Sequence, residues 1–322
     1  MSEEKALNVG PCKIEMAYER FGDPEAPPVL LVMGGGGQLI HWPEGFCAEL
    51  VARGCHVIRF DNRDAGLSTH FHDAPPPDLR AAMAGDTSSA SYTLSDMASD
   101  TVGLLDVLGL DSVHCIGASM GGMIAQLLAI EHPSRVRSLT SMMSTTGAPD
   151  VGRPDPAALS LVTEPPPTTN REHATERVAG SSPTDREEVI ERWVRAFQVV
   201  GSPGYPVEEA EIRENARIAY DRAYDPVGAS RQGVAALASG DRTAGLRSIT
   251  VPTLVIHGAD DPICDRSGGE ATAEVIPGAE LVIIDGMGHN LPRGLWPQLA
   301  SLIATFVQRT ESAMVTGRSH PR

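Results

Sequence analysis

The chain of 322 residues is long enough for one large α/β domain with an insertion, or for two modest domains. Its Asp and Glu residues (42) outnumber Lys and Arg (26), and the formal net charge of −16 argues against nucleic acid and anionic membranes as partners. Residues 1–5 lack signal-peptide character and no apolar run approaches the length of a membrane span, so we expect a cytoplasmic protein.

The first half of the chain alternates predicted strands with predicted helices. Residues 13–19 alternate in polarity, which is typical of a half-exposed outer strand, whereas residues 29–33 are continuously apolar and indicate a strand covered on both faces. A helix at 44–53 separates this strand from another at 55–60. Further elements are expected at 93–108, from 123 onward, and at 136–143, 253–257, 268–276, 281–284 and 294–309, with a frayed tail after about Thr310.

A polar turn, residues 61–68, follows the strand at 55–60, and we expect it to hold its loop through local hydrogen bonds. His70 and His72 come next. Residues two apart in an extended segment point to opposite sides and no third ligand lies nearby, so we expect no metal site here. The five cysteines are scattered without a C-x-x-C pair, which favours reduced thiols over disulfides or a zinc site.

The stretch 113–122 contains the pattern Gly117-x-Ser119-x-Gly121. An apolar strand precedes it and helically spaced apolar residues follow from Met123, so the chain must reverse within a few residues. Glycines suit both flanks because a Cβ there would clash with the neighbouring strand or helix. The Ser119 hydroxyl would then stand at the tip of a strained turn above a helix N-terminus, which favours a nucleophile over a surface turn.

No strong strand pattern occurs between about residues 147 and 247. Helices fit 185–200, 207–220 and 225–239, so we predict a helical lid at 147–247 inserted into a core formed by 1–146 and 248–322. The aromatic residues of this lid are candidates for substrate contact, with packing inside the lid as the alternative for each. These residues are Trp193, Phe197, Tyr205, Tyr220 and Tyr224, and His41 is a further candidate near the glycine loop.

A serine nucleophile needs a histidine to accept its proton and a carboxylate to orient that histidine. His289 lies between the last strand and the last helix, at the edge where the strand ends converge on Ser119. Two adjacent carboxylates follow the strand at 253–257, and we choose Asp261 as the acid with Asp260 as the alternative. The remaining strand histidines are expected to be structural: His56, His114 and His257.

Four glycines, residues 34–37, directly follow a buried strand, where flexible linkers rarely occur. A backbone without Cβ atoms can approach the nucleophile and direct an N–H toward a tetrahedral oxyanion. We predict the N–H of Gly35 as one donor of such an oxyanion hole and the N–H of Met120 as the second.

The set Ser119, Asp261 and His289 resembles the catalytic triad of the α/β-hydrolase family, and the resemblance covers about residues 12 to 310. It is similar in particular to the branch that includes aclacinomycin methylesterase, although Met33 replaces the familiar His before the glycines. The resemblance implies a mostly parallel central sheet flanked by helices, with the lid inserted before the penultimate core strands. The motifs that carry it are Leu31-Val32-Met33-Gly34-Gly35, His41-Trp42-Pro43, Phe60-Asp61-Asn62-Arg63-Asp64, His257-Gly258-Ala259-Asp260-Asp261-Pro262 and Gly286-Met287-Gly288-His289.

These residues predict a carboxylic ester hydrolase that forms an acyl-enzyme on Ser119 and acts on a small-molecule or polyketide-type ester, without cofactor or metal. An amidase or peptidase, a thioesterase or a cofactor-free perhydrolase could use the same triad. A non-hydrolytic cyclase or ligand-binding protein of the same fold is an alternative of another class. The sequence is compatible with a homo-oligomer, and it leaves the acyl and alcohol groups open.

Overall fold

The computed structural model describes residues 3–163 and 183–318. Within these residues one sheet of eight strands runs in the order β1-β2-β4-β3-β5-β6-β7-β8. The pairs β1–β2 and β2–β4 are antiparallel, and the other neighbouring strands are parallel. The strands are Glu4–Val9 (β1), Ile14–Phe21 (β2), Pro28–Val32 (β3), His56–Phe60 (β4), Val113–Ala118 (β5), Val136–Met142 (β6), Thr253–Gly258 (β7) and Glu280–Ile284 (β8).

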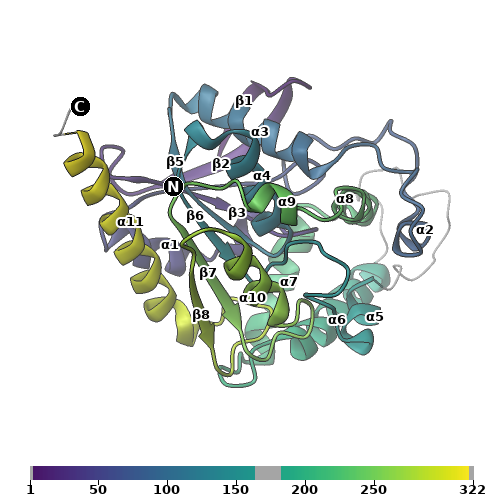
Figure 1. Ribbon diagram of the computed structural model, residues 1–322. Coiled ribbons are helices and arrows are strands. Elements are labelled where there is room, and N and C mark those ends of the chain that lie inside the picture. The colour runs from purple at the N-terminus through teal and green to yellow at the C-terminus, as the bar shows by residue number, and fades with distance from the viewer. Residues whose placement is uncertain (1–2, 164–182, 319–322) are drawn as a thin grey trace.

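Helices cover both faces of the sheet (Figure 1). On one face, α1 (Glu44–Val51) and α11 (Trp296–Arg318) pack against each other and on the strands. On the other face lie α3 (Leu94–Leu108), α4 (Met120–Glu131) and α10 (Ser267–Val275). Every residue of β3, β5 and β7 is buried, as expected for parallel strands between two helical layers, and the predicted α/β-hydrolase fold class is confirmed.

Several helices are inserted between β6 and β7 (Figure 1); the first three pack on one another in sequence, and the last contacts helices that cover the sheet. The helices predicted at 185–200, 207–220 and 225–239 are present within one or two residues of these limits. The inserted helices are α5 (Pro156–Thr163), α6 (Pro183–Val200), α7 (Glu209–Arg222), α8 (Pro226–Ala238) and α9 (Thr243–Leu246). A short helix of the preceding loop, α2 (Leu79–Met83), contacts α8.

Two features at the ends of the chain differ from the sequence expectations. The strand β1 was not predicted, because its charged and exposed residues leave only Ala6 and Val9 buried against the sheet. The tail expected after Thr310 is helical as far as Arg318, where α11 ends. Thr310 is itself buried and donates its hydroxyl proton to the Phe306 carbonyl, so the buried face of α11 extends beyond its last buried apolar residue, Val307.

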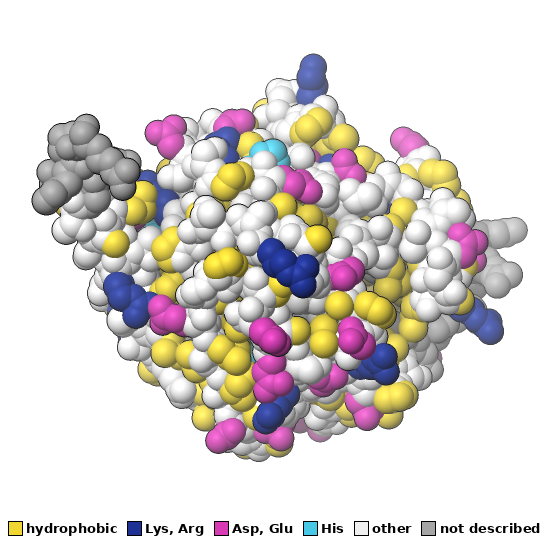
Figure 2. Space-filling model, viewed as in Figure 1, with side chains coloured by type: hydrophobic (Ala, Val, Ile, Leu, Met, Phe, Trp, Pro, Cys, Tyr) yellow, Lys and Arg dark blue, Asp and Glu magenta, His cyan; other side chains and the backbone are white. Residues whose placement is uncertain are grey.

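The surface mixes charges of both signs. On the face drawn in Figure 2, basic side chains lie singly among acidic and hydrophobic ones and form no stripe along the part of that face that is described. None of the helices in the described ranges combines the length and the apolar character that crossing a membrane requires.

Candidate active site

Ser119 lies at the turn between β5 and α4 with a backbone φ of 56° and ψ of −123°. A positive φ is uncommon for serine and costs backbone strain, so neighbouring groups must hold the turn in place. The Ser119 N–H donates to the Met142 carbonyl at 2.9 Å, and the Ser144 hydroxyl donates to the Ser119 carbonyl at 2.9 Å. The strained turn is thus bonded to the end of β6 on two sides.

The glycines that flank Ser119 leave no space for side chains. A Cβ at Gly117 would overlap the carbonyl oxygen of Gly121, and a Cβ at Gly121 would overlap the carbonyl oxygen of Val32 in β3. The strand, the turn and the helix therefore approach each other at backbone distance, and the steric reason predicted for both glycines is confirmed.

His289, in the loop after β8, lies between Ser119 and Asp261. Its Nε2 is 3.0 Å from Ser119 Oγ, and its Nδ1 is 2.7 Å from Asp261 Oδ2. The Asp261 side chain is fully buried, and its Oδ1 accepts the N–H groups of Ile263 and Cys264 at 2.9 Å each. Because these amides fix the carboxylate, the imidazole is held in one orientation toward the serine hydroxyl.

The neighbouring candidates occupy other positions. The carboxylate of Asp260, the alternative acid, accepts the N–H of Gly286 at 2.8 Å. His257 Nε2 lies 2.7 Å from the Cys264 carbonyl and 3.6 Å from Asp261 Oδ2. Burial lowers the pKa of His257, so its ring stays neutral near pH 7 and packs beside the Asp261 carboxylate without adding a charge.

The glycine loop after β3 runs beside the serine turn. A Cβ at Gly34 would lie 3.0 Å from the Ser119 Cβ, and a Cβ at Gly35 would lie 3.6 Å from the Met120 Sδ. The two backbone segments that carry the predicted oxyanion donors therefore face each other next to Ser119.

Gln232, in the inserted helix α8, holds this glycine loop. Its Oε1 accepts the Gly36 N–H at 2.7 Å, and its Nε2 donates to the Arg63 carbonyl at 2.6 Å. The side chain is fully buried, so both bonds are shielded from water. Sequence reasoning did not identify Gln232, because one glutamine in a helix resembles many solvent-facing ones until the helix is placed.

The segment after α6 supports the loop that carries His289. The His289 N–H donates to the Val200 carbonyl at 2.8 Å, and the Gly288 N–H donates to Ser202 Oγ at 2.9 Å. The Ser202 hydroxyl in turn donates to Asn290 Oδ1 at 2.5 Å. The insertion therefore contacts both the histidine loop and the glycine loop.

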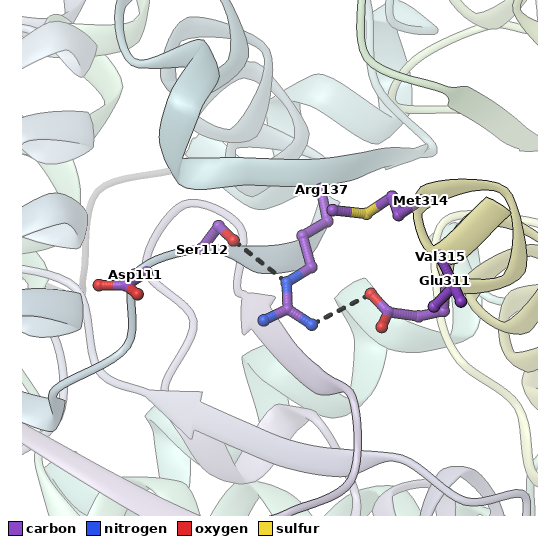
Figure 3. Close-up of a pocket in the computed structure, with 6 residues that line it drawn as sticks. All are labelled: Asp111, Ser112, Arg137, Glu311, Met314 and Val315. Atoms are coloured by element: carbon purple, nitrogen blue, oxygen red, sulfur yellow. Dashed lines mark hydrogen bonds and ion pairs between the residues drawn. The ribbon is translucent and has the colours of Figure 1, made fainter. Parts of the chain in front are cut away.

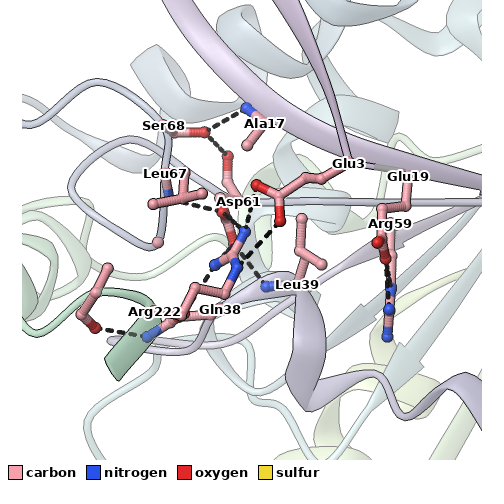
Figure 4. A network of polar contacts seen from close by, with 12 residues as sticks. Glu3, Ala17, Glu19, Gln38, Leu39, Arg59, Asp61, Leu67, Ser68 and Arg222 are labelled. Carbon is pink, nitrogen blue, oxygen red and sulfur yellow. Dashed lines mark hydrogen bonds and ion pairs between the residues drawn. The ribbon is translucent and has the colours of Figure 1, made fainter. Parts of the chain in front are cut away.

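The polar turn after β4 is joined to the insertion by a partly buried ion pair (Figure 4). Asp61 accepts the backbone N–H of Leu67 at 2.8 Å, a local bond of the predicted kind, and that of Leu39, from the loop after β3, at 2.6 Å. Its carboxylate also pairs at 2.5 Å with Arg222 at the end of α7, and Arg222 donates to Gln38 Oε1 at 2.7 Å. The expected local bonds are present, and the contact with the insertion adds to them.

The predicted substrate-contact residues divide into two groups. Trp193 and Tyr220 both pack on Tyr224 within the insertion, with ring centroids 5.9 Å and 4.9 Å away, and substrate contact stays a prediction for both. Phe197 is 38% exposed on α6. His41 Nδ1 accepts the Gln38 N–H at 2.8 Å, and burial lowers the pKa of His41 to about 4, so it is neutral near pH 7.

The reasoning that separated His70 from His72 is wrong. His70 is not in a strand and a turn begins at His72, and the two rings lie nearly parallel with centroids 5.3 Å apart. A third potential ligand, Asp225, is distant in sequence but near in the structure: it caps α8, and its Oδ2 lies 2.6 Å from His70 Nδ1. Donor atoms of all three side chains lie within 4.8 Å of one another.

A pocket of about 290 Å³ lies at the opposite edge of the sheet (Figure 3). Arg137 spans it, donating to Ser112 Oγ at 3.1 Å and pairing with Glu311 at 3.0 Å. Ser112 and Arg137 lie where β5 and β6 begin and Glu311 lies on α11, whereas Ser119 follows the end of β5, so this pocket is separate from the serine site. Its lining residues are Asp111, Ser112, Arg137, Glu311, Met314 and Val315.

Comparison with known sequences gives methylesterases among the similar proteins. The chain is 32% identical to rhodomycin D methylesterase DauP of Streptomyces sp. (strain C5) over 302 residues, which is 92% of this chain and 96% of that protein. It is 31% identical to rhodomycin D methylesterase DnrP of Streptomyces peucetius over 301 residues, again 92% of this chain and 96% of the relative.

Structure comparison supports the same fold. A hydrolase from Pseudomonas aeruginosa PA01 matches with a TM-score of 0.66 and 24% identity, over 95% of this chain and 98% of that one. Residues 27–292 match the family described as having the alpha/beta hydrolase fold, and the resemblance predicted from the sequence motifs is thereby confirmed. This chain belongs to the α/β hydrolase fold family.

Proposed function

We propose that this protein is a carboxylic ester hydrolase whose nucleophile is Ser119. The observation that carries the proposal is the line of hydrogen-bonding distances from Asp261 through His289 to Ser119, 2.7 Å and then 3.0 Å. The methylesterase relatives, which align over 92% of the chain, support ester cleavage as the reaction. The helical segment 147–247 is proposed as the lid over this site.

In the proposed reaction, Ser119 Oγ attacks the ester carbonyl carbon while His289 Nε2 takes the hydroxyl proton. Asp261 accepts the Nδ1–H bond and stabilises the imidazolium that forms. The carbonyl oxygen becomes an oxyanion, and the N–H groups of Gly35 and Met120 are the proposed donors to it.

The tetrahedral intermediate collapses by breaking the bond to the alkoxy group, which leaves as an alcohol after His289 returns the proton. His289 then takes a proton from water, and the resulting hydroxide attacks the acyl-enzyme. Collapse of the second intermediate releases the carboxylic acid and restores the Ser119 hydroxyl. Each proton therefore passes through the imidazole, and the chemistry uses only groups of this chain and water.

For the substrate, we propose the methyl ester of a polyketide-type carboxylic acid. Support comes from the names of the two relatives, which cleave a methyl ester of rhodomycin D according to those names. Methanol would then be the leaving alcohol, and the bulky acyl group would lie beneath the inserted helices.

The test compares the wild-type protein with Ser119→Ala on p-nitrophenyl esters of increasing acyl length and on rhodomycin D, the compound named for the two relatives, with methanol release as the second readout. Ser301→Ala, at an exposed serine of α11, is the matched control. We expect Ser119→Ala to reduce kcat by roughly 10⁴-fold or more and the control to retain activity.

Two results would contradict the proposal. Wild-type protein that cleaves none of these esters would exclude an esterase of this range, and an amide or thioester substrate would then be tried. Activity that survives in Ser119→Ala would remove Ser119 from the reaction. A fluorophosphonate probe that labels the wild type while no ester is cleaved would favour a binding role instead.

A further inference from the structure

The loop after β4 and the first turn of α8 bring two imidazoles and a carboxylate together outside the serine site. His70 Nδ1 lies 2.6 Å from Asp225 Oδ2, and the His72 ring lies parallel to the His70 ring at 5.3 Å between centroids. The nitrogen and oxygen donor atoms of the three side chains lie within 4.8 Å of one another. From this geometry we propose that His70, His72 and Asp225 bind a divalent transition-metal ion of the zinc type.

The surroundings of His70 are those of a metal ligand. Its Nε2 lies 2.9 Å from the Gly66 carbonyl, which can only accept, so Nε2 carries a proton. Nδ1 also donates a proton to Asp225 Oδ2 at 2.6 Å, and a bound metal ion would displace that proton and take its place at Nδ1. A histidine that binds metal commonly donates its other N–H to a carbonyl in this way, which fixes the ring and the tautomer. The coordinating nitrogen faces Asp225.

The carboxylate of Asp225 is held in the same manner. Its Oδ1 accepts the Gly228 N–H at 2.8 Å as the N-cap of α8, which leaves Oδ2 directed at His70. The second imidazole, His72, is exposed, so its ring can rotate without disturbing the packed interior. Two ligands are therefore positioned in advance, and the third is free to adjust.

The donor set selects the class of ion. Two imidazole nitrogens and one carboxylate oxygen suit Zn²⁺ and related first-row ions, whereas Ca²⁺ and Mg²⁺ prefer oxygen ligands alone. Zinc bonds of about 2.0–2.1 Å in tetrahedral geometry place the ligand atoms roughly 3.3 Å apart. Side-chain rotations would have to widen the 2.6 Å contact between His70 and Asp225 and bring the other donors, which lie within 4.8 Å, to that distance, and water can take the fourth position.

A metal at this position would join the core to the insertion. His70 and His72 belong to the loop after β4, whereas Asp225 begins α8, the helix that also carries Gln232. The ion would therefore fasten α8 to the core and stabilise the folded protein by mass action. The ester chemistry proposed above takes no part in this inference.

The experiment measures Zn²⁺ binding by isothermal titration calorimetry on full-length protein freed of metal with a chelator. The variants are His72→Ala, which removes an exposed ligand, and Asp225→Asn, which keeps an N-cap acceptor for Gly228 but removes the anionic ligand. The matched control is His132→Ala, at the end of α4 and outside the cluster. Unfolding temperatures with and without Zn²⁺ are recorded for each protein.

We expect the wild type and His132→Ala to bind one Zn²⁺ per chain and to gain thermal stability from it. His72→Ala and Asp225→Asn should bind at least about tenfold more weakly and lose that gain. Co²⁺ added to the wild type should give the intense visible absorption of a tetrahedral site. Absence of saturable binding in the wild type, or equal affinity in His72→Ala, would overturn the proposal and leave only an ion pair between His70 and Asp225.

Discussion

The ion pair between Arg231 and Asp64 is buried at both ends, and we predict that Arg231→Met destabilises the protein strongly. Arg231 is 2% exposed, and its guanidinium lies 2.7 Å from Asp64 Oδ1. Asp64 also accepts the Tyr92 hydroxyl and the Phe71 N–H at 2.7 Å each. Removal of Arg231 would leave an anion in the interior with only those neutral donors.

The expected size follows from the cost of an uncompensated buried charge. Breaking a buried pair by removing one partner costs about 3–5 kcal/mol. The two remaining donors of Asp64 keep the carboxylate hydrogen-bonded, so we expect the lower end, about 3 kcal/mol, in the free energy of unfolding. Methionine fills most of the volume that the arginine side chain leaves, so the loss of unfolding free energy reports the unpaired charge and not a cavity.

Urea unfolding followed by circular dichroism measures the change. Arg266→Met, which removes an exposed partner of Glu270, is the control and should change the unfolding free energy by only about 0.5 kcal/mol or less. The double variant Arg231→Met with Asp64→Asn removes both charges and should be more stable than Arg231→Met alone. A loss below about 1 kcal/mol in Arg231→Met, or no recovery in the double variant, would refute the reasoning.

Three further predictions concern the serine site. Gln232→Leu removes the acceptor of the Gly36 N–H and should lower kcat about tenfold with little change in KM. Gln198→Leu, on the exposed side of α6, should leave both constants unchanged, and equal kinetics of the two variants would contradict a role for Gln232. Gly288→Ala would place a Cβ against the Gly201 carbonyl and displace the His289 loop, so kcat should fall by about 10²-fold while the circular dichroism spectrum stays unchanged. If the variant kept the kcat of the wild type, the loop would have absorbed the clash and the prediction would be wrong. Asp261→Asn should lower kcat by about 10⁴-fold and Asp260→Asn much less, and the reverse order would make Asp260 the acid.

The local patterns in the sequence were sufficient for the fold class and for the serine turn. Continuous apolar runs at β3, β5 and β7 can be buried only in a sheet covered on both faces, and the glycines around Ser119 have a steric reason that is readable from the pattern itself. The loop position of His289 followed from the same alternation. Short-range signals of this kind need no knowledge of distant contacts.

The sequence was less informative about the two ends of the chain and about the roles of aromatic residues. The strand β1 buries too few residues to give a clear period of two, and the last turns of α11 continue beyond its apolar stripe. Trp193 and Tyr220 were candidates for substrate contact because aromatic side chains serve both roles, and only the position of Tyr224 showed that they pack together.

Contacts that join distant segments were decided by the tertiary structure alone. Gln232 reaches Gly36 across 196 residues and Arg231 reaches Asp64 across 167, and no local spacing records either pair. Asp225 meets His70 across 155 residues, so a cluster that looked incomplete along the chain gains its third member in space. By itself the sequence determined which side chains could do chemistry and where the strands other than β1 lie. The packing of the inserted helices on the core decided which of those side chains meet, because that packing depends on long-range burial and charge pairing.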